Sequence, residues 1–192
     1  MRYTSSEKIE LFIGKEISTS FVDYINAAER YINQYTGRNF TAGNTEALRQ
    51  YNGTNTRELF IDDCIEITKV EVGDDYYGDT FTEVTDYLTM PANNTALNVP
   101  VNKLWLKDGV FQFGIQNHQI TAKWGYSEEA PDDIVWATTF LASSIYKSGS
   151  SGVGGVKSEK IGDFSVSFNN DKELTDFNKV QTILDKYKRF RV

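Results

Sequence analysis

Cysteine and histidine are almost absent from this chain, which has one of each, Cys64 and His118, among 192 residues. A single cysteine cannot form a disulfide within the chain, and the pair cannot supply the ligands of a zinc site. No motif places a nucleophile beside His118, so we expect a surface or interface histidine rather than a general base. Cys64 is expected to be a small packed residue. We therefore expect no catalytic residue, no metal and no cofactor.

Long apolar runs and an excess of basic residues are also missing. The first residues, MRYTSSEKIELFIG, lack an apolar stretch of signal-peptide length, and no run approaches the roughly 20 residues of a membrane span. We therefore expect synthesis in a cytoplasm and no membrane contact. Lys and Arg number 20 against 27 Asp and Glu, a net charge of −7. Because nucleic-acid binding depends on cations that neutralise phosphates, this balance argues against a protein that mainly holds DNA or RNA.

Helical periodicity marks the first 45 residues. Thr4 and Glu7 predict a capping box for a short helix that ends at Gly14. Ser20 and Asp23 predict the start of a longer helix, which Gly37 would cap. Its apolar residues recur at helical spacing: Phe21, Ile25, Ala28, Ile32 and Tyr35. The chain is therefore expected to begin with two helices.

Short alternating runs replace this pattern between 46 and 126. They are RELFI, IEITKVEV, DTFTEV, KLWLK and HQITAKW. Turn signals between them lie at Asn52-Gly53, Gly73-Asp74, 91–94, 98–100 and Asp108-Gly109. In IEITKVEV the apolar phase slips between Ile67 and Val70, which indicates a bulge near Lys69. These features predict a mostly antiparallel β lobe inserted between helices.

The segment 127–192 completes the predicted core. Pro131 and the two aspartates after it fit the first turn of a central helix, IVWATTFLASSIYK. That helix has one stripe of Ile134, Ala137, Leu141 and Ile145 and a second stripe of Trp136 and Phe140. One partner cannot bury both stripes, so we expect Trp136 and Phe140 to contact a neighbouring subunit.

A loop, a hairpin and a last helix follow. GSSGVGG predicts a flexible loop, and KSEKIGDFSVSF predicts a hairpin that turns at Gly162-Asp163. Phe164 and Val166 share one face of the hairpin and are further candidates for a subunit interface. The closing helix has one apolar stripe: Leu174, Phe177, Val180, Leu184 and Tyr187. The predicted class is α+β, with a helical bundle of 1–45 and 127–192 and a β lobe of 46–126.

Acidic and glycine-rich motifs give little support to an enzyme or a metal site. Acidic pairs occur at Asp62-Asp63, Asp74-Asp75, Glu128-Glu129 and Asp132-Asp133, where solvated turns and helix starts explain them better than paired hydrolase carboxylates. GDDYYGD, from Gly73 to Asp79, lacks the spacing of an EF-hand loop. GSSGVGG lacks the Gly-Lys-Ser/Thr ending of a phosphate-binding loop and follows a helix.

Two clusters remain as interaction candidates. Aromatic residues of the β lobe, notably Tyr76, Tyr77, Trp105 and Phe111, could form a glycan-binding face, although aromatics in strands are more often core. KYKRFRV at the C-terminus combines Lys186, Lys188, Arg189 and Arg191 with Tyr187 and Phe190. These cations complement a helix dipole, and the same composition is typical of an interface hot spot. Both interpretations of each cluster stay open.

Five segments in order resemble the head-to-tail connector proteins of long-tailed double-stranded DNA phages, also called adaptor or head completion proteins. The segments are AAERYINQYTGRNF, RQYNGTNTRELFIDD, QITAKWGYSEEAPDDIVWATTFLASSIY, KSEKIGDFSVSF and the helix that ends in LDKYKRF. The resemblance spans nearly the whole chain. The β lobe is larger than in the smallest members of that family.

The resemblance implies a non-enzymatic virion protein at the head–tail junction. Proteins of this kind form a ring, usually a dodecamer, that docks under the portal after packaging, meets the stopper or tail completion protein, and passes double-stranded DNA without holding it. It also implies portal binding through C-terminal residues, here Tyr187, Arg189, Phe190 and Arg191. A glycan-binding or host-recognition β module of a phage is the alternative. A carboxylate hydrolase is a third hypothesis.

Overall fold

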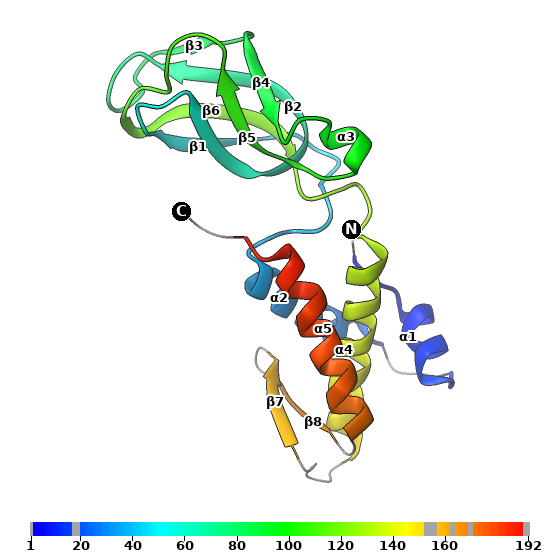
Figure 1. Ribbon diagram of the computed structural model, residues 1–192. Coiled ribbons are helices and arrows are strands. Elements are labelled where there is room, and N and C mark those ends of the chain that lie inside the picture. The colour runs from blue at the N-terminus through cyan, green and yellow to red at the C-terminus, as the bar shows by residue number, and fades with distance from the viewer. Residues whose placement is uncertain (1, 17–19, 152–156, 162–163, 169–170, 190–192) are drawn as a thin grey trace. The chain divides into compact units, whose positions relative to one another are not determined.

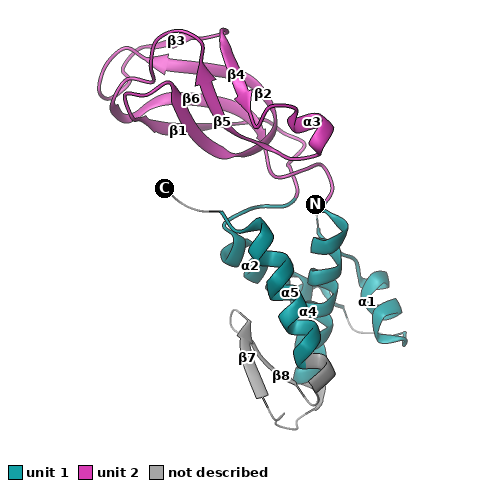
Figure 2. Cartoon of the chain, viewed as in Figure 1, with its two compact units in different colours: residues 1–40, 130–192 teal, residues 41–129 magenta. Residues whose placement is uncertain are grey.

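The computed structural model describes residues 2–16, 20–151, 157–161, 164–168 and 171–189, with side chains outside 149–173. It forms two compact units, 1–40 with 130–192 and 41–129 (Figure 2). The first unit is mainly helical and the second holds an antiparallel sheet. The α+β prediction is therefore confirmed. None of the described helices is long and apolar enough to cross a membrane.

The helical unit is built around one central helix. It contains α1 (Ser6–Ile13), α2 (Val22–Thr36), α4 (Asp132–Ser151), α5 (Asp171–Tyr187) and the hairpin strands β7 (Lys157–Ile161) and β8 (Phe164–Phe168) (Figure 1). Helix α4 packs against α1, α2, α5 and β8. The predicted stripes supply the buried residues Phe21, Ile25, Ala28, Ile32, Ile134, Ala137, Leu141, Ile145, Phe177, Val180 and Leu184. Helical periodicity thus identified this core correctly.

The helix ends agree with the sequence at their C-termini and differ at their N-termini. Gly14 and Gly37 cap α1 and α2 in the left-handed conformation, as predicted. The predicted capping box at Thr4 is wrong, because Ser5 caps α1 and the Thr4 hydroxyl is buried 2.7 Å from that of Thr139. Phe21, rather than Ser20, occupies the N-cap of α2, and its side chain is fully buried and makes no capping hydrogen bond.

Helix α4 begins as predicted and ends later. The Pro131 carbonyl accepts a hydrogen bond from the Val135 amide, so the proline stands at the entry to the first turn. The loop predicted from Gly149 is wrong at its start, because α4 continues to Ser151. Helical hydrogen bonds there outweigh the low helix propensity of glycine and serine. The rest of that loop, 152–156, and the predicted turn at 162–163 lie outside the described residues.

The β lobe is one antiparallel sheet in the order β1-β6-β2-β5-β4, with β3 paired to β2. The strands are β1 (Ala47–Gly53), β2 (Glu58–Gly73), β3 (Phe81–Glu83), β4 (Tyr87–Met90), β5 (Val101–Leu106) and β6 (Gly114–Trp124). RELFI and IEITKVEV, predicted as two runs, form the single strand β2. Its register against β6 shifts between Ile67 and Lys69, which confirms the predicted bulge.

The lobe has its own apolar core. Leu59, Ile61, Val70, Leu104, Phe111 and Ile120 belong to it, together with Cys64 and Trp124. Ile120, Ala122 and Trp124 are buried, as the alternation in QITAKW predicted. The turn expected at 91–94 is partly a short helix, α3 (Asn94–Leu97), and Asn52-Gly53 ends β1 rather than forming a turn. The lobe is therefore a compact unit with an apolar core of its own.

Candidate interaction surfaces

Tyr187, a predicted portal-binding residue, is anchored in the helical unit. Its hydroxyl donates to Asp133 Oδ1 at 3.0 Å, and its ring packs edge-on against Phe40 with centroids 5.2 Å apart. Its carbonyl accepts from Arg38 Nε at 2.6 Å, and the Arg189 amide donates to the Thr36 carbonyl. The end of α5 is therefore held against α2 and the first turn of α4. Phe190 and Arg191 lie outside the described residues.

Exposed cations lie beside this anchored end. Lys186 and Lys188 are exposed near the C-terminus of α5. The Lys188 ammonium lies 5.0 Å from the centroid of the Tyr35 ring, whose hydroxyl donates to Asp185 at 2.6 Å. That hydrogen bond to a carboxylate is the main cause that raises the pKa of Tyr35 to about 12. Part of the predicted cluster is thus on the surface, while Tyr187 fixes its position.

The second stripe of α4 has a partner inside the same chain. Phe140 is only 5% exposed and packs edge-on against Phe12 of α1. Trp136 stacks on Phe140 with centroids 5.9 Å apart and remains partly exposed. The inference that one partner cannot cover both stripes therefore overlooked α1. An interface on this side would include Trp136 and residues of α1.

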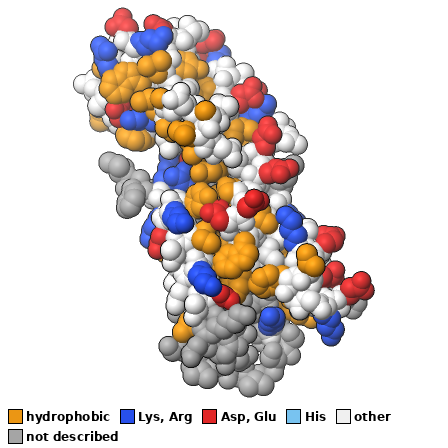
Figure 3. All heavy atoms as spheres, turned by 45° about the vertical axis from the view of Figure 1, so that its right-hand side comes forward, with side chains coloured by type: hydrophobic (Ala, Val, Ile, Leu, Met, Phe, Trp, Pro, Cys, Tyr) orange, Lys and Arg blue, Asp and Glu red, His pale blue; other side chains and the backbone are white. Residues whose placement is uncertain are grey.

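Helix α1 carries the most exposed large apolar side chain among the described residues. Leu11 is 85% exposed, and Phe12 beside it is partly exposed. Figure 3 shows hydrophobic side chains grouped on the surface of the helical unit. Phe164 and Val166, the other predicted interface residues, lie on β8, which packs against α4. Their side chains are outside the described part of the chain.

The structure separates the four aromatic residues proposed for a glycan-binding face. Phe111 is fully buried in the lobe core, and Trp105 is partly buried on β5. Tyr76 and Tyr77 are exposed with ring centroids 4.8 Å apart. Phe113, which the sequence analysis missed, joins them 5.7 Å from Tyr76. The sequence gives no signal for this exposure, because Phe113 lies two residues after the buried Phe111 and alternation would place both on one face.

The titratable candidates have structural roles. Burial is the main cause that lowers the pKa of His118, and its Nε2 lies 3.1 Å from the Gln112 carbonyl oxygen. His118 is therefore buried, contrary to the expectation of a surface histidine. Cys64 is buried as predicted, and burial raises the pKa of its thiol to about 12. Neither side chain is prepared for nucleophilic or acid–base chemistry.

Members of three acidic pairs take part in turns, ion pairs or helix contacts. Asp62 pairs with Arg49 at 2.6 Å, and Asp75 accepts hydrogen bonds from the amides of Tyr77, Gly78 and Asp79. The pKa of Asp75 is lowered, mainly by the Asp79 amide. Among the described residues, no three His, Cys, Asp or Glu side chains are grouped to hold a metal ion.

Comparisons with known proteins agree on one kind of relative. A family model described as head completion protein matches residues 7–190. No curated protein matches the sequence at a significant level. Among solved structures, the chain is similar to one in the neck of an empty gene transfer agent particle computed with C6 symmetry, with a TM-score of 0.60 and 12% identity over 97% of this chain and 89% of that one.

Two further structures come from the same kind of particle. A chain in the virion of a native gene transfer agent particle gives a TM-score of 0.58 at 14% identity, over 97% of this chain and 89% of that one. A chain in the neck of a native particle computed with C12 symmetry gives 0.55 at 14% identity, over 90% and 83%. At these identities the likeness establishes a shared fold.

Proposed function

This chain belongs to the head completion protein family, and we propose from that premise that it is a non-enzymatic connector at the head–tail junction of a phage-like virion. The observation that carries the proposal is the family match over residues 7–190. The likeness in fold to chains of particle necks supports it. The roles found for His118, Cys64 and the acidic pairs are structural and suit a protein whose task is assembly.

The connector is proposed to act as a ring, most simply of twelve copies. The C6 and C12 symmetries with which the similar necks were computed support a cyclic arrangement. A cyclic ring needs two different complementary patches on each copy. We assign one patch to Leu11 and Phe12 of α1 together with Trp136 of α4, because these apolar side chains retain exposed surface in the isolated chain. Phe164 and Val166 remain proposed members.

The C-terminal end is proposed to bind the portal. Tyr187 positions this end through Asp133, and the cations at Lys186 and Lys188 are exposed. In this arrangement Arg189, Phe190 and Arg191 contact the portal, while Tyr187 fixes the position of the end of α5 that precedes them. Opposite surfaces of the ring would then meet the stopper or tail completion protein.

The charge distribution suits a passage for DNA. The whole chain has a net charge of −7, and the lobe, 41–129, carries 14 acidic and 6 basic residues. Acidic walls repel phosphates, so they let duplex DNA pass without retention. We therefore propose that the ring borders the DNA channel and holds no DNA itself.

Co-expression with the portal protein of the same virus tests this function. We expect the two proteins to purify as one complex with several copies of this chain per portal. A chain that stays monomeric and never associates with the portal would contradict the connector function. Retention of such a monomer on a glycan column would favour the glycan-binding module instead.

A further inference from the structure

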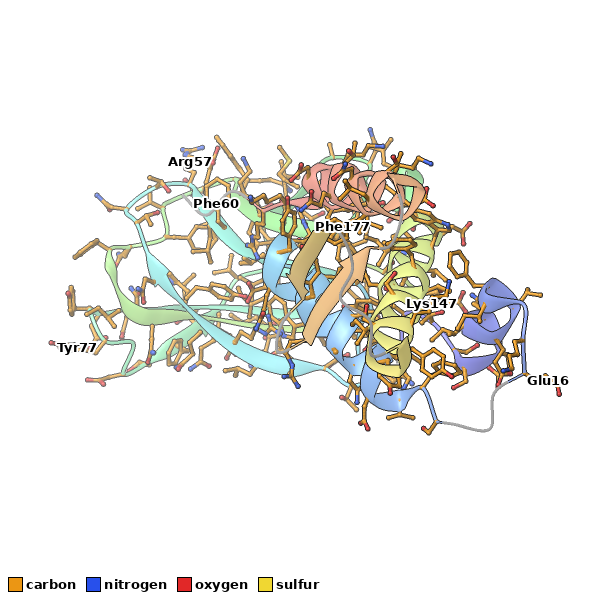
Figure 4. All side chains as sticks on the ribbon, turned by 90° about the horizontal axis from the view of Figure 1, so that it is seen from below. Glu16, Arg57, Phe60, Tyr77, Lys147 and Phe177 are labelled. Atoms are coloured by element: carbon orange, nitrogen blue, oxygen red, sulfur yellow. The ribbon has the colours of Figure 1, made fainter. Side chains whose placement is uncertain are left out.

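The loop end of the β lobe presents an aromatic surface, which we name the aromatic tip and define as Tyr76, Tyr77, Phe113 and Ile115. All four side chains are exposed, with Tyr77 at 68% and Phe113 at 64%. Figure 4 shows Tyr77 pointing outward from this end of the lobe. Tyr76 contacts both Tyr77 and Phe113, so the rings form one continuous patch.

Buried polar groups hold the backbone beneath the tip. The Asn117 side chain accepts from the Gly53 amide at 3.0 Å and donates to the carbonyls of Gln112 and Asp75 at 3.0 and 3.4 Å. One buried amide therefore joins the end of β1 to the β2–β3 and β5–β6 loops. The Ile115 amide also donates to the Tyr76 carbonyl at 2.8 Å.

Close backbone approach makes the tip compact. A Cβ at Gly114 would lie 2.5 Å from the Tyr76 carbonyl oxygen, and one at Gly78 would lie 2.9 Å from the Asn117 Cα. Only glycine permits these approaches. A surface whose backbone is already ordered loses little conformational entropy when it binds a partner. The tip therefore has the features of a preformed interface rather than of a mobile loop.

The electrostatic surroundings of the tip favour a cationic occupant. Asp74, Asp75 and Asp79 flank the tyrosines, and there is no basic residue between Lys69 and Lys103. Five of the six basic residues of the lobe already form ion pairs within it: Arg49, Lys69, Lys103, Lys107 and Lys123. Duplex DNA and a second lobe, each strongly negative, are repelled.

We propose that the aromatic tip is the docking site for a segment of another protein that presents arginine side chains beside apolar ones. Guanidinium groups stack on tyrosine rings and pair with carboxylates. The tip supplies the tyrosine rings, and the flanking aspartates supply the carboxylates. Apolar neighbours of the arginines would cover Phe113 and Ile115. This contact goes beyond the ring and portal functions, because it gives the β lobe a partner of its own.

Titration of the isolated protein with an amidated hexapeptide of alternating arginine and leucine tests the proposal. Backbone amide NMR shifts should change in a saturable manner at 74–79 and 113–116. Tyr77→Ser with Phe113→Ser should weaken binding about tenfold or more, since aromatic hot spots dominate such contacts. Asp74→Asn with Asp79→Asn should weaken it as well.

Two control variants separate docking at the tip from general attraction to an acidic protein. Leu97→Ser removes an exposed apolar side chain, and Glu128→Gln with Glu129→Gln removes two exposed charges elsewhere on the lobe. Both should leave affinity within about twofold. Equal losses in these controls, shifts away from the tip, or no saturable binding would overturn the proposal. So would saturable binding of an oligosaccharide or DNA at the tip in place of the peptide. Because the test needs neither ring nor portal, its failure is distinct from failure of the connector function.

Discussion

The Tyr187 hydroxyl donates a hydrogen bond to Asp133, 3.0 Å away, and thereby joins the last turn of α5 to the first turn of α4. These residues are 54 positions apart in the chain. Since Tyr187 also contacts Phe40, it connects three parts of the helical unit at one point. The C-terminal end of the described chain therefore has a defined position from which to meet a partner.

Tyr187→Phe should lower the free energy of unfolding by about 1–2 kcal/mol, because Asp133 loses a hydrogen-bond donor while the ring contact with Phe40 is kept. Tyr77→Phe, at an exposed position of the lobe, should change it by less than about 0.5 kcal/mol. Urea denaturation of both variants measures the difference. Equal stability of the two variants would show that the bond to Asp133 contributes nothing.

Deletion of 190–192 should retain the fold and abolish portal binding. The truncation leaves Tyr187 and the bond from the Arg189 amide to Thr36 in place. A deletion that began at Tyr187 would also remove these contacts, so it would test stability together with binding. Far-ultraviolet circular dichroism and portal pull-down separate the effects. Unchanged portal binding would move the contact to the hairpin or the lobe.

Leu11→Ser should weaken ring formation and leave the monomer folded, because an 85% exposed side chain contributes little to the core. Leu97→Ser is the matched control, an exposed leucine in the lobe. Native mass spectrometry of each variant with portal measures the number of bound copies. Equal ring yields for both variants would exclude α1 from the interface.

Asn117→Ala should lower the free energy of unfolding by about 2–4 kcal/mol, since it leaves the Gly53 amide and two carbonyls without their buried partner. Gln50→Ala, at an exposed position on β1, should have little effect. Thermal unfolding of both variants provides the comparison. A loss no larger than that of Gln50→Ala would show that Asn117 is not the link that holds the three segments.

The free energy of unfolding should decrease as the pH is lowered, because His118 is buried in its neutral form. Burial lowers the pKa of His118 below 6.5 in the folded chain. As the pH falls below 6.5, the imidazole is therefore protonated more readily in the unfolded chain than in the folded chain. Its contribution is present above about pH 6.5 and is lost as the pH falls toward the folded pKa. His118→Gln should flatten the dependence of the unfolding free energy on pH at pH values below 6.5. An unchanged slope would contradict this assignment.

Local sequence patterns predicted most helices and strands, whereas they did not predict which elements pack against one another. Helical spacing identified the buried face of α4, and the phase slip near Lys69 identified the bulge in β2. The continuity of β2 was missed because Asp62 and Asp63 interrupt its apolar alternation. The structure keeps these residues in the strand, with Asp62 paired to Arg49.

The candidate surfaces were harder to predict than the elements. Nothing local indicates that α1 covers Phe140, since Phe12 and Phe140 meet only through the fold. For the same reason, the sequence does not identify Asn117 as the residue that joins the end of β1 to two loops. The composition of the C-terminal cluster is visible in the sequence, but the anchoring of Tyr187 depends on Asp133 and Phe40, which are distant in the chain.

The most direct test of the connector function is cryo-electron microscopy of the complex between this protein and the portal of its own virus. A closed ring of this chain should lie on the portal, with twelve copies and with 186–192 at the shared interface. Single copies bound without a ring, or no complex at all under conditions where the portal is intact, would contradict the account.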